Sequence, residues 1–203
     1  MEVEVKERLL SEADWKRVYD VLNKDSSVTP VHQRNVFFDT EDGALNKKRI
    51  GMRLRFYEDK CLVTCKEPVL FADGIHRAKE IEEFIPKEVG AAVLAAPSEL
   101  PRVSAVARDT LDRNVPGGAP AAAKKLLICG SFENYRASFP FEGKVLELDK
   151  TIYDFGMRYE IEIECDEPEV MRKRLLEFLD ENNVSHTASK YSKLACMFKK
   201  LLE

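Results

Sequence analysis

The first residues of the chain carry acidic and basic side chains at a spacing that could bind a metal ion and an anion together. Glu2, Glu4 and Lys6 alternate with Val3 and Val5, which predicts a strand with the three charged side chains on one face. Two carboxylates about 7 Å apart repel each other, but a divalent cation could join them, because Mg²⁺ and Mn²⁺ prefer carboxylate oxygens. Lys6 would then meet an anionic ligand of the metal. An ordinary solvated strand fits the same alternation, so the pentapeptide alone leaves both interpretations open.

A second pair of like charges, now basic, lies further along the chain. Arg53 and Arg55 share one face of a strand expected at residues 52–56, whose other face is apolar. A short turn leads to a strand expected at 61–66, and in so short a hairpin Lys66 can face the same side as the two arginines. Because the planar guanidinium group suits phosphate oxygens, this face is a candidate phosphate-binding site.

Three further strands have a face whose charged side chains are all acidic. These residues are Glu80 and Glu82 in the strand expected at 75–85, Glu147 and Asp149 at 145–149, and Glu160, Glu162 and Glu164 at 159–164. A solvated face of an antiparallel sheet is common, but such a face usually mixes the two signs. Closing the sheet into a barrel would remove its exposed edges. Since unpaired interior charges cost several kcal/mol each, water, metal ions and a bound polyanion would have to offset that cost.

Apolar spacing and capping residues predict the remaining elements. Helices are expected at 11–24, 88–96, 103–112 and 168–182, with Ser11 capping the first and Pro168 in the first turn of the fourth. Further strands are expected at 31–39 and at 126–139, the second of which carries Arg136. Residues 114–120 are rich in glycine and proline and predict a loop. Ser189 is expected to cap a last helix that contains Lys193.

Composition narrows the class of protein. A formal net charge of −4 and no run of basic residues argue against a general nucleic-acid binder. Five scattered cysteines predict reduced thiols in a cytoplasmic protein. No apolar leader or run of about 18 apolar residues is found, so we expect neither a signal peptide nor a membrane span. Because charged strands resume after the loop at 114–120, residues 1–203 are expected to form a single domain.

The order of these charged motifs resembles that of the CYTH family, also called triphosphate tunnel metalloenzymes. The resemblance rests on the Glu-x-Glu-x-Lys run at 2–6, the Arg-Leu-Arg-Phe run at 53–56, and the acidic runs near 147 and 160. Residues 153–156 followed by 159–162 are similar to plant members with tripolyphosphatase activity. The resemblance implies an α+β fold: a closed eight-stranded antiparallel β-barrel, the triphosphate tunnel, with helices packed on its outside.

The resemblance also implies a role for each charged residue. The expected ligands of one or two Mg²⁺ or Mn²⁺ ions are Glu2, Glu4, Asp149, Glu160 and Glu162, with Glu147 and Glu164 as further candidates. The expected phosphate-binding residues are Lys6, Arg53, Arg55, Lys66, Arg136 and Lys193. The residues expected to assist catalysis are Glu80 and Glu82, which would contact the ions through water or orient basic side chains, and Lys193, which would position or deprotonate the attacking water.

The implied activity is hydrolysis of inorganic tripolyphosphate to pyrophosphate and phosphate, by a water molecule that a bound metal activates. Thiamine triphosphate, a nucleoside triphosphate, or cyclisation of ATP to cAMP would fit the same scaffold. A non-catalytic polyphosphate-binding protein would need the basic residues but not the acidic ones. A purely structural barrel with a solvated face remains the alternative without a ligand.

Overall fold

The computed structural model describes residues 2–72, 74–115, 120 and 124–202. The strands are β1 (Glu2–Leu9), β2 (Val31–Thr40), β3 (Gly51–Tyr57), β4 (Lys60–Ala72), β5 (Ile75–Ile85), β6 (Leu126–Phe141), β7 (Lys144–Tyr153), β8 (Gly156–Glu164) and β9 (His186–Ala188). The helices are α1 (Glu12–Leu22), α2 (Ala44–Lys47), α3 (Lys87–Ala95), the 3₁₀ turn η1 (Pro97–Glu99), α4 (Leu100–Val103), α5 (Ala105–Asn114), α6 (Pro168–Glu181) and α7 (Lys193–Lys199).

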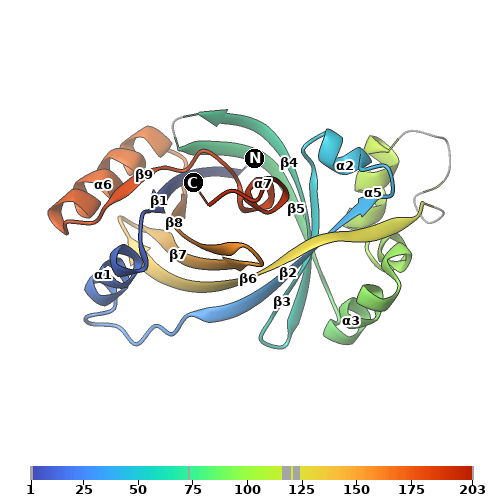
Figure 1. The fold of residues 1–203 in the computed structure, drawn as a ribbon, viewed down its shortest axis with the longest axis horizontal. Coiled ribbons are helices and arrows are strands. Elements are labelled where there is room, and N and C mark those ends of the chain that lie inside the picture. Colours follow the sequence, from blue (N-terminus) through green and yellow to red (C-terminus); the bar gives the residue numbers. More distant parts are fainter. Residues whose placement is uncertain (1, 73, 116–119, 121–123, 203) are drawn as a thin grey trace. The chain divides into compact units, whose positions relative to one another are not determined.

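Strands β1 to β8 pair into a closed antiparallel ring. Their order is β5-β4-β3-β2-β6-β7-β8-β1, β5 also pairs with β1, and the short β9 is added beside β1 (Figure 1). Closure leaves no unpaired edge among the eight strands. The predicted closed eight-stranded barrel is therefore confirmed, and β9 is a short ninth strand near the extended piece that the sequence indicates around 184–186.

The chain forms two compact units, and several strands contribute to both. Unit 1 contains Met1–His32, Val69–Ala78 and Glu133–Glu203, and unit 2 contains Gln33–Pro68 and Lys79–Phe132. Each unit therefore includes its own part of the barrel strands. The expectation that residues 1–203 form one domain stays a prediction.

In unit 1, helices α1 and α6 cover the apolar face of the sheet. Val5 and Leu9 on β1 pack with Ile161 and Ile163 on β8 in a core cluster that also holds Leu175 of α6. Helix α1 starts as predicted, because the hydroxyl of its N-cap Ser11 accepts a hydrogen bond from the backbone N–H of Asp14. Val170 of α6 is 58% exposed and lies outside this core.

In unit 2, helices α3, α4 and α5 pack on a separate core. This core joins Leu54 of β3 and Val63 of β4 to Val93, Leu100 and Leu111 of the helices. The helices expected at 88–96 and 103–112 are present as α3 and α5. Of the expected loop at 114–120, residues 116–119 lie outside the described residues. No helix in the described part of the chain is long and apolar enough to cross a membrane.

The close approach of α3 to β4 gives a first testable prediction. A methyl group at Gly90 would lie 2.3 Å from Sγ of Cys61 and 3.1 Å from the ring of Phe56. We expect Gly90→Ala to lower the free energy of unfolding by about 1–3 kcal/mol, because the buried contact must be forced apart. Urea unfolding measures this loss, and Gly143→Ala serves for comparison, since only its positive φ opposes the substitution there. Equal stability of wild type and Gly90→Ala would contradict the packing described here.

The last helix begins later than the sequence predicts. Helix α7 starts at Lys193, and its N-cap is Ser192, whose hydroxyl accepts a hydrogen bond from the N–H of Ala195. Ser189, the expected cap, is fully buried, and its hydroxyl donates a hydrogen bond to Glu160 on β8. Tyr153 on β7 donates a hydrogen bond to the carbonyl of Lys193, so the start of α7 is attached to the sheet of unit 1.

Candidate functional site

The strand registers of unit 1 bring the charged motifs of four strands onto one face of the sheet. Lys6 on β1 lies opposite Glu162 on β8, Asp149 on β7 lies opposite Glu160 on β8, and Arg136 on β6 lies opposite Asp149. Successive side chains alternate across a strand, so this face is opposite the apolar one that α1 and α6 cover. We call the residues Glu4, Lys6, Arg136, Glu147, Asp149, Glu160, Glu162 and Lys193 the charged cluster.

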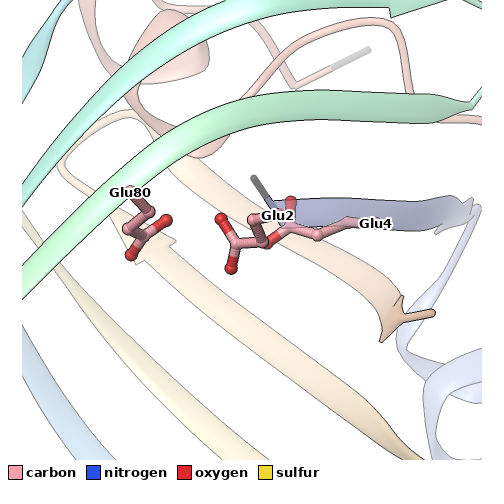
Figure 2. Close-up of side chains that lie close together, drawn as sticks. All are labelled: Glu2, Glu4 and Glu80. Carbon is pink, nitrogen blue, oxygen red and sulfur yellow. The ribbon is translucent and has the colours of Figure 1, made fainter. Parts of the chain in front are cut away.

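Glu2 and Glu4 supply neighbouring carboxylates at the start of β1. Each offers an oxygen within 4.8 Å of an oxygen of the other, which is a separation that one cation could bridge. Glu80 is on β5, two residues beyond Ala78, the register partner of Glu2. Figure 2 shows these three side chains and the strands that carry them.

Arg136 makes the most contacts in the charged cluster. Its Nε donates to Oδ1 of Asp149 at 2.8 Å and its Nη2 donates to Oδ2 of the same carboxylate at 2.6 Å. The same Nη2 donates to Oε2 of Glu162 at 2.9 Å, and Nη1 pairs with Glu147. Asn134 adds a hydrogen bond to Oδ1 of Asp149. Both oxygens of Asp149 are therefore held by donors, in the forked geometry that favours Arg–carboxylate pairs.

Two lysines complete the pairing of the acidic residues. Lys6 Nζ lies 2.7 Å from Oε2 of Glu4 and 2.9 Å from Oε1 of Glu162. Lys193 Nζ lies 2.5 Å from the same oxygen of Glu162, 2.8 Å from Oδ2 of Asp149 and 3.6 Å from Oε2 of Glu160. The residues expected to bind phosphate therefore pair, in unit 1, with the residues expected to bind metal.

Glu160 differs from Asp149 and Glu162 because only one of its oxygens accepts hydrogen bonds. Oε1 accepts from Ser189 at 2.6 Å and from Arg158 at 3.0 Å, and Arg158 also donates to Ser189. All three residues are at most 2% exposed. Oε2 of Glu160 is buried and accepts no hydrogen bond, and Lys193 Nζ lies 3.6 Å from it.

These contacts set the ionisation of the cluster. Burial alone would raise the pKa of Asp149, but Arg136 and Lys193 outweigh it and hold that pKa below its ordinary value. Burial alone would also raise the pKa of Glu162, but the charges of Lys193, Lys6 and Arg136 outweigh it and lower that pKa strongly. Burial and the charge of Lys6 lower the pKa of His76 to about 3. At neutral pH Asp149 and Glu162 are therefore charged and His76 is neutral.

Unit 2 has its own charged face, on β3, β4 and β5. Lys66 lies opposite Gly51, two positions from the pair formed by Arg53 and Thr64, so Lys66 shares the face of Arg53 as predicted. Arg53 Nη2 lies 3.4 Å from Oε1 of Glu80, and Lys66 Nζ lies 2.7 Å from its Oε2. Glu80 therefore forms ion pairs with both Arg53 and Lys66.

Arg55 and Glu82, on the same face, each contact an uncharged side chain. Arg55 donates from Nε to Oδ1 of the buried Asn35 at 3.1 Å. Glu82 accepts from the hydroxyl of Thr64 at 2.9 Å, and burial together with the charge of Glu80 raises its pKa. Glu83 points the other way, where it accepts hydrogen bonds from Ser104 and from the N–H of Val106. Only Glu80 and Glu82 of this acidic run therefore share the charged face.

Three residues of the site were not identified from the sequence. Arg158 follows the same alternation as Glu160, so its face could have been predicted. Asn134 is uncharged, and no spacing distinguishes it from a core polar residue. Ser189 was assigned to a helix cap. His32 is exposed and pairs with Glu133, whereas His76 is buried beside the cluster.

The comparisons with known proteins agree with this geometry. The model of the CYTH domain matches residues 1–191, which is most of the chain. The protein belongs to the CYTH family. This membership confirms the resemblance inferred from the charged motifs, and it accounts for their order along the barrel strands.

Two solved structures share the fold over nearly their whole length. HpAC1 from Hippeastrum, a candidate adenylyl cyclase described as having a dominant triphosphatase activity, is 33% identical, with 100% of this chain and 98% of that chain covered and a TM-score of 0.90. A protein from Bacillus halodurans, described as a candidate adenylate cyclase, is 25% identical, with coverage of 97% and 98% and a TM-score of 0.74. A search of curated proteins gave no match.

Proposed function

We propose that this CYTH protein is a metal-dependent triphosphatase that hydrolyses inorganic tripolyphosphate to pyrophosphate and phosphate. The observation that carries the proposal is the charged cluster, in which buried carboxylates and buried cations neutralise each other on one face of the sheet. A stable fold alone gives little reason for such a cluster, because hydrophobic residues of similar volume are often as stable. The triphosphatase activity described for HpAC1, which is 33% identical, supports the same conclusion.

The acidic residues fit a divalent cation. Glu2 and Glu4 offer two oxygens that one ion could join, and Oε2 of Glu160 is a buried carboxylate oxygen that accepts no hydrogen bond. A set of carboxylate oxygens suits Mg²⁺ and Mn²⁺. When bound, such an ion would lower the pKa of a water molecule and place it for attack on phosphorus. Asp149 and Glu162 are further candidate ligands, although cations of the protein hold them here.

The basic residues fit the substrate. Lys6, Arg136 and Lys193 in unit 1, and Arg53, Arg55 and Lys66 in unit 2, would bind phosphate oxygens. Their charges would stabilise the negative charge that spreads over the phosphoryl oxygens and the leaving group. Glu80 would keep Arg53 and Lys66 in place, since it contacts both. Water is the proposed nucleophile, and the ammonium group of Lys193 would position it.

Cyclisation of ATP to cAMP is a second candidate function, because both similar structures are described as candidate adenylyl or adenylate cyclases. A substrate panel separates the two functions. Phosphate and cAMP are measured with tripolyphosphate, thiamine triphosphate, ATP and pyrophosphate, each with Mg²⁺, with Mn²⁺ and with EDTA. EDTA-sensitive phosphate release that is fastest from tripolyphosphate supports the proposal. Release of cAMP as the main product would replace it, and tight polyphosphate binding without turnover would indicate a sensor.

Removal of Arg53 tests the basic residues of unit 2. We expect Arg53→Ala to raise KM for tripolyphosphate about tenfold or more and to lower kcat less, because a charged hydrogen-bond donor to the substrate is lost. Arg102→Ala is the matched control, since Arg102 belongs to the same unit and pairs with the exposed Glu99. Steady-state phosphate release gives both constants. If KM and kcat of Arg53→Ala equal those of wild type, the phosphate-binding face has been misplaced.

A further inference from the structure

The ammonium group of Lys193 lies among three carboxylates that could also hold a metal ion. Its Nζ is 2.5 Å from Glu162, 2.8 Å from Asp149 and 3.6 Å from Glu160. The three carboxylates are at most 8% exposed. The ammonium group has buried acidic oxygens on three sides, as a bound cation would, although Arg136 also contacts Asp149 and Glu162 and Lys6 also contacts Glu162.

The fit of the ammonium group to these carboxylates is incomplete. Oε1 of Glu160 is held by Arg158 and Ser189, whereas Oε2 faces Lys193 at 3.6 Å and accepts no hydrogen bond. This distance is too long for a hydrogen bond, and a buried acceptor without one is costly. A divalent cation ligated by Oε2 would satisfy this oxygen, so a cation in the place of the ammonium group would suit the cluster better.

Lys193 can leave these carboxylates at lower cost than the two arginines that contact them. Arg136 is fixed by several hydrogen bonds from a rigid planar group, and Arg158 is wholly buried between Glu160 and Ser189. Lys193 is the first residue of α7, and its charge lies at the end of a flexible four-carbon chain. Its side chain can therefore turn away while the helix stays attached to the sheet.

We propose that Lys193 is an exchangeable counter-ion, which neutralises Asp149, Glu160 and Glu162 until a divalent cation replaces it, and which then binds the triphosphate. This inference rests on the proposed triphosphatase function, because it assigns the released ammonium group to the substrate. Metal and triphosphate should therefore bind with positive coupling. The metal releases the Lys193 side chain to the triphosphate, and the triphosphate holds that side chain away from the carboxylates that bind the metal. Such coupling is reciprocal: the metal strengthens triphosphate binding by the same factor.

Replacement of the lysine by a neutral side chain gives opposite effects on the two ligands. Mn²⁺ binding in the absence of triphosphate is measured by calorimetry for wild type and Lys193→Gln. We expect the variant to bind Mn²⁺ about tenfold or more tightly, because a positive charge leaves the site. Tripolyphosphate binding in EDTA should become about tenfold or more weaker. Lys150→Gln is the matched control, because Lys150 adjoins Asp149 on β7 but pairs with Glu12 of α1, and it should leave both affinities unchanged.

Unchanged or weaker Mn²⁺ binding by Lys193→Gln would overturn the proposal that a divalent cation replaces Lys193, even if the wild-type protein hydrolyses tripolyphosphate. If the variant unfolds without metal, Mn²⁺-induced folding followed by circular dichroism replaces calorimetry. Folding at Mn²⁺ concentrations below the wild-type dissociation constant supports the exchange, and no response to Mn²⁺ overturns it. Tighter Mn²⁺ binding by the variant, in a protein that hydrolyses no triphosphate, would instead reject the proposed function and leave the exchange standing.

Discussion

Glu4→Gln is expected to lower kcat/KM for tripolyphosphate at least about a hundredfold, because it removes the charge of a proposed metal ligand. Glu2→Gln should act similarly, since the two carboxylates lie together at the start of β1. The fold should survive both changes. The like-charge repulsion between Glu2 and Glu4 is relieved, and Lys6 keeps its second partner, Glu162. Phosphate release over a range of Mn²⁺ concentrations measures the loss.

Glu7→Gln is the contrasting variant on the same strand. Glu7 is fully buried on the opposite face of β1, where Arg172 of α6 and His186 contact it. Its loss should lower the free energy of unfolding while kcat and KM stay close to those of wild type. Full activity in both Glu2→Gln and Glu4→Gln would show that these residues hold no catalytic metal. Equal loss of activity in Glu7→Gln would show that the effect is structural.

Arg136→Met should lower the free energy of unfolding in metal-free solution by about 3–5 kcal/mol, because the buried carboxylates lose the cation that neutralises them. Asp149, Glu147 and Glu162 all contact this guanidinium group. Burial alone would lower the pKa of Arg136, but these carboxylates hold it well above its ordinary value, so the charged form is the one that the fold requires. Urea unfolding in EDTA measures the change.

Two comparisons make the Arg136 experiment specific. Arg136→Lys keeps the positive charge but loses the planar, forked set of guanidinium donors, so its free energy of unfolding should lie between those of Arg136→Met and wild type. Lys144→Met removes a lysine that pairs with Asp166 at the surface, and its urea midpoint should stay near that of wild type. If Arg136→Met unfolds at the wild-type midpoint, the carboxylates of the cluster are not charged as described.

Alternation along the strands was sufficient to predict which side chains share a face. Glu2, Glu4 and Lys6 could be assigned together because the period of a strand is fixed, and Lys66 could be placed beside Arg53 because the connecting turn is short. The barrel itself was inferred from the order of these strands and from the family resemblance. The strand face on which each charged side chain lies, and the order of the strands, could therefore be predicted without a structure.

Contacts between side chains that are far apart in the sequence could not be predicted in the same way. The sequence indicated separate acidic and basic residues, but it gave no sign that Arg136 binds Asp149 or that Lys193 lies among three carboxylates. These pairs depend on strand register and on where α7 meets the sheet. Ser189 illustrates the difficulty, since its type fits a helix cap equally well, and only its buried contact with Glu160 shows otherwise. The roles assigned to the site residues stay predictions until variants are measured.

The most direct test of the central claim is a phosphorus NMR measurement of tripolyphosphate turnover in ¹⁸O-labelled water with Mn²⁺, repeated with EDTA. Attack of water on the terminal phosphorus predicts one phosphate and one pyrophosphate per substrate, with the label in the phosphate alone. EDTA should stop the reaction. Unchanged tripolyphosphate in the presence of Mn²⁺, or turnover at the same rate in EDTA, would contradict the account of this protein as a metal-dependent triphosphatase.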